Sequence, residues 1–428
     1  MISGQGEMAK QNLVKDADQA GPWTAASLRL ILRSKLYWGL GFLLIFGAFS
    51  SPVTSKGVNI FLSLGNLTDV LRQVSVTGIV AVGMTLVILI AGIDLSVGSI
   101  LALGTVICAM LLTQEGWTTA SYLGVPAVGA IMFICSWAVI SVIRGFIRDK
   151  GSIPGPLASP TITVLTALVC AGVAAWLMVW LAGQVPGKFG VLAVLITVPC
   201  VCALFGAING ALIVYGRLQP FIVTLAMMVG ALGLARLIAG QDTAVYPVYT
   251  GTNATENFET LRMLLWGVIP VPGLFFLAVL AVFYALTRFT TYGAYLLAIG
   301  GNEQASRLAG INVNRIKIAT YTISSALAGL AGILYVAQFR QGKPDAGMGL
   351  ELDAIAAVVI GGTSLMGGRG SVIGTMVGVL IFGFLGNILQ LNNIDSNSQL
   401  VLKGAIIIAA VLLQEGQLGV IFSKLRKP

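Results

Sequence analysis

Histidine is absent from this chain of 428 residues, and charged side chains make up only 10% of it. Without histidine the protein lacks the commonest metal ligand and the usual proton shuttle, which argues against a haem or zinc enzyme of the membrane. Soluble domains carry roughly 25% charged residues, so this chain has too few to cover a water-exposed surface. A mean hydropathy of +0.93 and a hydrophobic content of 57% predict a protein that crosses the lipid bilayer many times.

The positive net charge and the positions of the cysteines argue against a nucleic-acid-binding protein and against a disulfide-bonded or metal-binding one. The net charge is +9, but no basic run is interleaved with aromatic residues, so nucleic acid is not a predicted partner. Lys and Arg retained in cytoplasmic loops explain the excess. All of the cysteines lie in apolar stretches, which favours buried thiols over disulfides or a metal site: Cys108, Cys135, Cys170, Cys200 and Cys202.

Apolar runs of about 17–25 residues, separated by polar or Gly/Pro-rich breaks, predict about twelve transmembrane helices and an all-α fold. We place the spans at 36–50, 73–91, 97–112, 122–143, 161–181, 190–214, 218–239, 264–286, 318–337, 352–367, 371–390 and 399–415. Residues 66–72 resemble an amphipathic lead-in to the second span. The predicted organisation is a cytoplasmic tail (1–35), a transmembrane domain (36–417) and a second cytoplasmic tail (418–428). This orientation leaves most Lys and Arg of the connections inside, as the positive-inside rule requires.

The connection 287–317 is the longest charged segment between two predicted spans. Its charges are mostly positive: Arg288, Glu303, Arg307, Arg315 and Lys317. Residues 302–309 are rich in helix formers, and Gly310 is a natural stop for a helix. Composition leaves two interpretations open. The segment is either an ordinary cytoplasmic connection or a short surface helix that fits a groove on a partner protein.

Three other stretches carry functional signal. Asp94 and Ser96 lie between two apolar runs, where they either cap the next helix or line a polar pathway. The glycine-rich stretch 349–374, with Thr363 and Ser364, predicts an interrupted helix beside a pathway. It has no G-K-[ST] sequence, so ATP use would need a separate subunit. The polar loop 240–263 is long enough to dock an external partner.

Four segments occur in a specific order: GIDLSVGS at 92–99, ING with PFIVTLAMM at 208–228, AIGGNEQASRLAGINVNRIK at 298–317, and ELDAIAAVVIGGTSLMGGRGSVIG at 351–374. Together they resemble the sugar permeases of bacterial ABC importers, of the ribose, xylose and arabinose type. The resemblance runs from about residue 66 to 415. It is broken by additional sequence, read as an inserted helix pair over 121–188.

The resemblance implies a ten-helix core, extended here by the inserted pair, that works as a homodimer in the bacterial inner membrane. It implies a partner ATPase with two nucleotide-binding domains, which uses ATP and Mg, and a periplasmic sugar-binding protein. The chain itself would then be a transport subunit without catalytic residues, cofactor or metal. The cytoplasmic coupling element of such permeases would be carried by Asn302, Glu303, Gln304, Ala305, Arg307, Gly310 and Asn314. The family's Glu-Ala-Ala pattern is altered here to Gln304, Ala305 and Ser306.

In such a permease the binding protein supplies most of the selectivity, so the pathway needs hydroxyls and amides rather than a tight charged site. The candidate pathway residues are Asp94, Ser96, Asn209, Thr224, Thr363, Ser364 and Asn387. Two alternatives stay open from the sequence. One is an ion-coupled secondary sugar carrier, which needs intramembrane acids or broken-helix ion sites. The other is an ABC permease for branched-chain amino acids.

Overall fold

The computed structural model describes residues 35–55, 57–113, 125–131, 168–169, 172, 190–240 and 245–414. Both predicted tails, apart from Lys35, lie outside the described residues. So do most of the predicted inserted pair at 121–188 and its two spans, together with Cys135 and Cys170. Residues 125–131, which are described, are helical.

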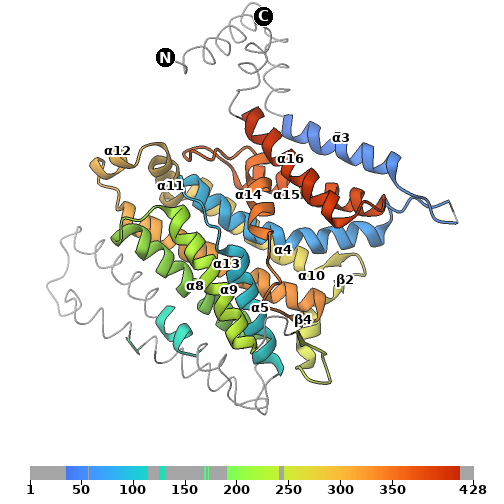
Figure 1. Cartoon of the computed structure of the whole chain (residues 1–428), viewed down its shortest axis with the longest axis horizontal. Helices are drawn as coiled ribbons and strands as arrows, with labels where there is room; N and C mark the ends of the chain where they lie inside the picture. The colour runs from blue at the N-terminus through green and yellow to red at the C-terminus, as the bar shows by residue number, and fades with distance from the viewer. Residues whose placement is uncertain are drawn as a thin grey trace, which may run out of the picture.

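Helices form the body of the described structure (Figure 1). They are α3 (Lys35–Ser50), α4 (Leu64–Leu89), α5 (Val97–Thr113), α8 (Val191–Tyr215), α9 (Pro220–Ala239), α10 (Val271–Phe289), α11 (Thr291–Gly301), α12 (Glu303–Leu308), α13 (Val313–Phe339), α14 (Leu350–Ile360), α15 (Val372–Leu391) and α16 (Ser396–Gln414). Within the described ranges, six are long and apolar enough to cross a membrane, namely α4, α8, α9, α10, α13 and α15. The chain is therefore a polytopic, mainly helical membrane protein.

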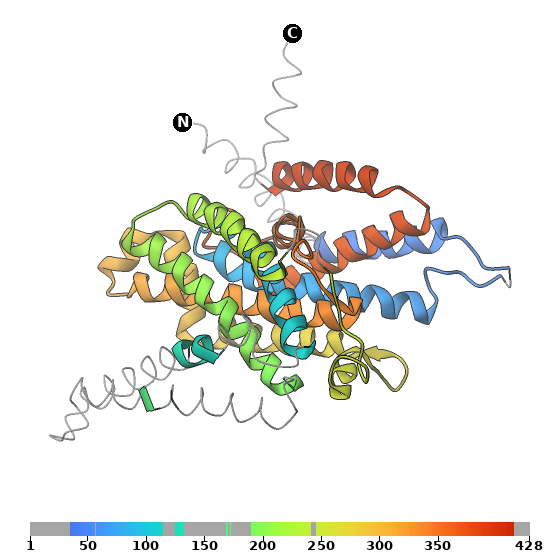
Figure 2. The same ribbon diagram turned by 60° about the horizontal axis from the view of Figure 1, so that its bottom comes forward.

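Short strands and a 3-10 helix gather at one end of the molecule. They are β1 (Tyr246–Pro247), η2 (Glu256–Arg262), β2 (Leu264–Leu265), β3 (Ile269–Pro270) and β4 (Gln341–Gly342). β1 pairs with β4, and β2 pairs with β3, both antiparallel. We call this the sheet end, and the opposite end, with α11 and α12, the loop end. Figures 1 and 2 both show α12 at the left and the sheet end toward the lower right.

Two predicted spans and the predicted lead-in differ from the observed helices. The span 264–286 was placed too early, because Trp266 and Gly267, both at positive φ, turn the chain into the β2–β3 hairpin before α10 begins. The lead-in at 66–72 is not separate but forms the start of α4, which is capped by the Ser63 hydroxyl. The span 352–367 is wrong beyond Ile360, where α14 ends.

The glycine-rich stretch after α14 is a turn rather than helix. Gly362, Gly367 and Gly368 all have positive φ, a conformation that disfavours any residue with a Cβ. The amide of Gly368 donates to the carbonyl of Leu89 at 3.0 Å, so the turn docks on the end of α4. The interruption predicted within 349–374 is thus confirmed, and its place beside a pathway stays a prediction.

Helix α13 lies at the centre of the bundle and packs on α8 through two glycines. Gly206 and Gly210 of α8 are four residues apart, so they lie on one face of that helix. A Cβ on Gly206 would clash with the Tyr321 carbonyl of α13, and one on Gly210 would lie 2.7 Å from the Ile318 Cα. Small residues at this spacing let two membrane helices approach closely.

Helices α4 and α5 approach α13 in the same way. A Cβ on Gly83 of α4 would lie 3.0 Å from the Ser324 Cα, and one on Gly332 of α13 would lie 2.9 Å from the Leu101 carbonyl of α5. Helices α4 and α15 are instead joined by polar pairs. The Thr85 and Thr375 hydroxyls lie 2.6 Å apart in the core.

The glycine contact between α8 and α13 is open to a direct test. We expect Gly206→Val to lower the free energy of unfolding by about 1–3 kcal/mol or more, because the backbone of α13 cannot yield to the added methyl groups. The midpoint of thermal unfolding in detergent measures this effect. Gly230→Val in α9 is the matched control, since its Cβ would meet nothing within 4 Å. Equal changes in the two variants would contradict the packing argument.

Candidate functional site

Helix α12 is a short, well-defined helix at the loop end. It begins after Asn302, whose side-chain oxygen accepts from the Ala305 amide at 2.9 Å and satisfies one of the free amides of the first turn. The next turn residue, Gly310, has φ +83°, which ends the helical path. Asn312 then caps α13 by accepting from the Arg315 amide at 3.2 Å. The predicted surface helix with a stop at Gly310 is thus confirmed.

A clamp of charged side chains fixes α12 to the start of α13. Glu303 accepts from Lys317 at 2.6 Å and from Arg307 at 2.8 Å. Arg307 also donates to the side chain of Asn314 at 3.0 Å. Partial burial raises the pKa of Glu303, but the hydrogen bonds and charges of Lys317 and Arg307 outweigh it and hold that pKa below its ordinary value. We call Glu303, Arg307, Asn314 and Lys317 the clamp.

The clamp leaves the outward face of α12 uncovered. Gln304, Ala305 and Leu308 are exposed, and the side chain of Leu308 is 90% exposed. Ser306, by contrast, is buried and donates to the Asn302 carbonyl at 2.9 Å. Sequence analysis did not single out Leu308. Single exposed apolar side chains are common on protein surfaces, so the exposure of Leu308 does not by itself mark an interface.

Four of the predicted pathway residues lie close together in the interior. Asp94 is fully buried and accepts from the Ser96 hydroxyl at 2.6 Å, the Ser96 amide at 3.1 Å and the Ser324 hydroxyl at 3.3 Å. Asn209 of α8 donates to the Ser96 hydroxyl at 3.0 Å. Thr224 of α9 donates to the backbone carbonyl of residue 93 at 3.2 Å.

These four residues join the α4–α5 turn to three other helices. Asp94 accepts from the Ser96 amide, which precedes the first residue of α5, so this hydrogen bond shapes the turn before the helix and does not cap one of its free amides. The carboxylate is also buried among membrane helices. Buried polar groups of this kind are costly unless they are hydrogen-bonded, so the network fixes how α8, α9 and α13 meet the turn. Whether the cluster also lines a pathway stays a prediction.

The other predicted pathway residues lie elsewhere. Thr363 is buried and Ser364 half-buried in the turn after α14. Asn387 of α15 exchanges two hydrogen bonds with Asn66 of α4, at 2.7 and 3.0 Å. Asn387 is therefore a link between two helices. The structure thus gathers the first four candidates and leaves these three apart.

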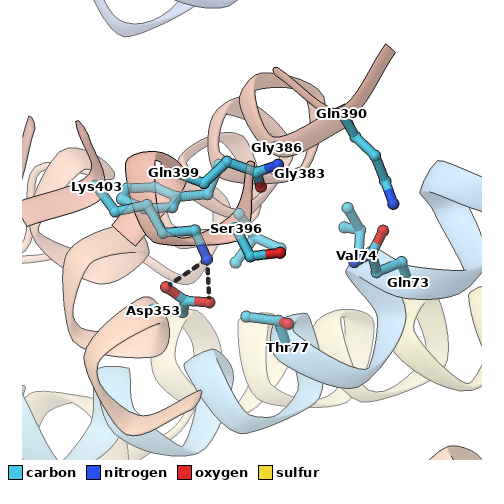
Figure 3. A pocket seen from close by; sticks show the side chains of 12 residues that line it. Gln73, Val74, Thr77, Asp353, Gly383, Gly386, Gln390, Ser396, Gln399 and Lys403 are labelled. Carbon is cyan, nitrogen blue, oxygen red and sulfur yellow. Dashed lines mark hydrogen bonds and ion pairs between the residues drawn. The ribbon is translucent and has the colours of Figure 1, made fainter. Parts of the chain in front are cut away.

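A polar cavity lies between α4, α14, α15 and α16 (Figure 3). Its volume is about 180 Å³, and it is lined by Gln73, Val74, Thr77, Asp353, Val379, Phe382, Gly383, Gly386, Gln390, Ser396, Gln399 and Lys403. None of the predicted pathway residues is among them. Sequence analysis missed the cavity because its polar residues come from four helices that are separated along the chain, although glutamines beside apolar runs were a usable signal.

An ion pair closes one side of this cavity. The Lys403 ammonium of α16 lies 3.0 and 2.8 Å from the two carboxylate oxygens of Asp353 on α14. Figure 3 shows this pair on one side and Gln73 and Gln390 on the other. Asp353 also lies in the first turn of α14, where a negative charge is favourable. Sequence analysis did not predict this pair, because its partners are 50 residues apart in the chain.

Comparison with known proteins identifies relatives over about four-fifths of the chain. Residues 66–411 match the family model described as "Branched-chain amino acid transport system / permease component". The ribose import permease of Haemophilus influenzae is 36% identical over 82% of this chain and 85% of its own length. The D-allose permease of Escherichia coli is 31% identical over 82% and 84%. The fructose import permease of Rhizobium meliloti is 31% identical over 83% and 79%. No solved structure matches the chain.

The clamp generates a prediction about pH and local order. Because the pKa of Glu303 is lower in the folded state, its contribution is fully present above its ordinary value of 4.5 and is lost as the pH falls through the lower folded-state pKa. We expect Glu303→Gln to lose that contribution already at neutral pH. Amide hydrogen exchange over residues 302–312, corrected for intrinsic rates, should become several-fold faster, since partly exposed ion pairs are individually weak.

The matched control is Gln304→Ala, which changes an exposed neighbour outside the clamp. At neutral pH its amide hydrogen exchange should match that of the unchanged protein. Its exchange should also become faster as the pH falls and Glu303 is protonated, as in the unchanged protein. Equal protection in Glu303→Gln and Gln304→Ala would show that the clamp does not hold α12.

Proposed function

Because the chain belongs to the family of permease subunits that includes the sugar permeases of bacterial ABC importers, we propose that it carries a monosaccharide into the cytoplasm. The observation that carries this proposal is the similarity itself, which spans about four-fifths of the chain and of its relatives. Those relatives are named for ribose, D-allose and fructose. The named sugars favour neither the secondary carrier nor the amino acid permease.

The second part of the proposal assigns the loop end to the cytoplasm. Lys and Arg near the ends of spans resist translocation, and the loop end carries Arg288, Arg307, Arg315 and Lys317. The termini would then lie in the cytoplasm of a bacterium, with the protein in its inner membrane. The sheet end would face the periplasm, where a sugar-binding protein delivers its ligand.

We further propose that α12 transmits force from an ATPase subunit with two nucleotide-binding domains. The proposal is supported by the exposed Leu308, which suits an apolar groove on the partner, and by the clamp, which ties α12 to α13. A displaced α12 would therefore move α13, the helix on which α4, α5 and α8 pack. No ATP site is needed in this chain, because ATP and Mg would act on the partner subunit.

Transport follows if the two external ligands favour the same conformation. ATP and the loaded binding protein must each bind one state of the permease more tightly than the other, since only differential affinity shifts an equilibrium. We propose that a homodimer switches between a state open to the cytoplasm and one open to the periplasm. The Asp94 cluster lies where α13 meets the α4–α5 turn, so a movement of α13 would reach it directly.

Purification of the chain from its native membrane in mild detergent tests this function. We expect an ATPase subunit to co-purify, and the complex to take up radiolabelled ribose, allose or fructose in liposomes when ATP and the binding protein are supplied. A preparation without ATPase that takes up sugar in response to an ion gradient would contradict the proposal.

The same preparation tests the role of α12. Leu308→Asp places a charge where the partner groove is proposed to be apolar, so co-purification of the ATPase should be lost while the permease stays folded. Met348→Asp is the control, because this residue is also an exposed apolar side chain, 71% exposed, but lies between β4 and α14. Loss of the ATPase in both variants, or in neither, would count against α12 as the contact.

A further inference from the structure

The cavity between α4, α14, α15 and α16 is lined by side chains that can both donate and accept hydrogen bonds. The side-chain amides of Gln73, Gln390 and Gln399 each donate and accept, as do the hydroxyls of Thr77 and Ser396. A sugar hydroxyl also donates and accepts, so each of these groups can pair with it in either sense. Ligand sites in general need only a few such convergent polar groups.

The charge in the cavity is balanced. Lys403 donates to both carboxylate oxygens of Asp353, so the pair presents an ammonium and a carboxylate with no net charge. The side chains of the pair are only 24% and 30% exposed. A neutral hydroxyl can accept from the ammonium and donate to the carboxylate. An anionic solute would meet the carboxylate without an excess positive charge to offset it.

Apolar side chains also line the site. Val74, Val379 and Phe382 are buried members of the lining, and Gly383 and Gly386 bring the α15 backbone to the cavity surface. A Cβ on Gly383 would clash with Val74, whereas a Cβ on Gly386 would meet nothing within 4 Å. Gly386 therefore borders open space. Sugars carry C–H groups on their ring faces as well as hydroxyls, and both kinds of surface have a counterpart here.

We propose that this cavity is a solute-binding station of the permease for a neutral, polyhydroxylated molecule, and that the Asp353–Lys403 pair selects against charged ones. That the solute is the transported monosaccharide rests on the proposed function. The residues of this site differ from those considered above, since none of the pathway residues predicted from the sequence lines this cavity.

Filling the cavity is the first test. Gly386→Leu should reduce ATP-dependent uptake of radiolabelled ribose by the complete importer in liposomes to near background, because the side chain occupies the space of the solute. Binding-protein-stimulated ATP hydrolysis should persist, since the loop end is unchanged. Gly230→Leu in α9 is the matched control, as its Cβ also meets nothing within 4 Å and it lies outside the cavity.

Removing one polar group tests the same site without adding bulk. Gln399→Ala should lower uptake by roughly tenfold, the scale of a lost polar contact with solute. Asn397→Ala, an exposed amide two residues away in α16 and outside the cavity lining, should leave uptake unchanged. Asp353→Asn should make uptake sensitive to ribose 5-phosphate at concentrations that leave the unchanged importer unaffected, because Lys403 then attracts the phosphate.

The outcomes separate the two proposals. Should the unchanged importer take up none of ribose, allose and fructose, the monosaccharide function fails and this inference fails with it. Should it take up one of them while Gly386→Leu and Gln399→Ala match their controls, the cavity is not the binding station although the protein is a sugar permease. A third outcome is that Gly386→Leu and Gln399→Ala lose uptake, but Asp353→Asn is no more sensitive to ribose 5-phosphate than the unchanged importer. That result would overturn the selectivity assigned to the ion pair.

Discussion

Close approach of helices to α13 is the constraint on which the rest of the structure depends. Inside a bilayer, apolar surface gains little by leaving lipid, so helices associate through tight packing and interhelical hydrogen bonds. Gly83, Gly206 and Gly210 bring α4 and α8 against the α13 backbone, and Gly332 lets α5 do the same. A side chain larger than hydrogen at any of these positions would overlap the neighbouring helix or press against it. A rigid central helix is what allows an event at one end of the molecule to reach the middle.

Polar side chains then fix the positions that packing leaves free. At the loop end, Glu303 and Lys317 tie α12 to the first turns of α13. Deeper in the bundle, Ser324 of the same helix donates to Asp94, at the turn that joins α4 to α5. Both interactions use one helix, so the exposed face of α12 and the buried polar cluster are connected through continuous structure. This arrangement is the physical basis for the proposed transmission of force.

The cavity depends on a different property, the short length of α14. That helix has 11 residues and ends at a glycine-rich turn, so it does not fill the thickness that its long neighbours span. Asp353 near its start is held by Lys403 of α16, and the glycines of α15 leave space beside them. The short helix α14 thus contributes a carboxylate to a cavity whose other hydrogen-bonding groups come from α4, α15 and α16.

The sequence by itself determined the membrane class, six of the predicted spans and the short helix before Gly310, because hydropathy, helix propensity and glycine stops act over neighbouring residues. It also determined the interruption after α14. Only the tertiary structure decided that Trp266 and Gly267 start a hairpin, that Asn387 pairs with Asn66, and that Asp353 meets Lys403, 50 residues away. Such pairs depend on how each helix is rotated and packed against its neighbours, and that information is not contained in any local stretch of the chain.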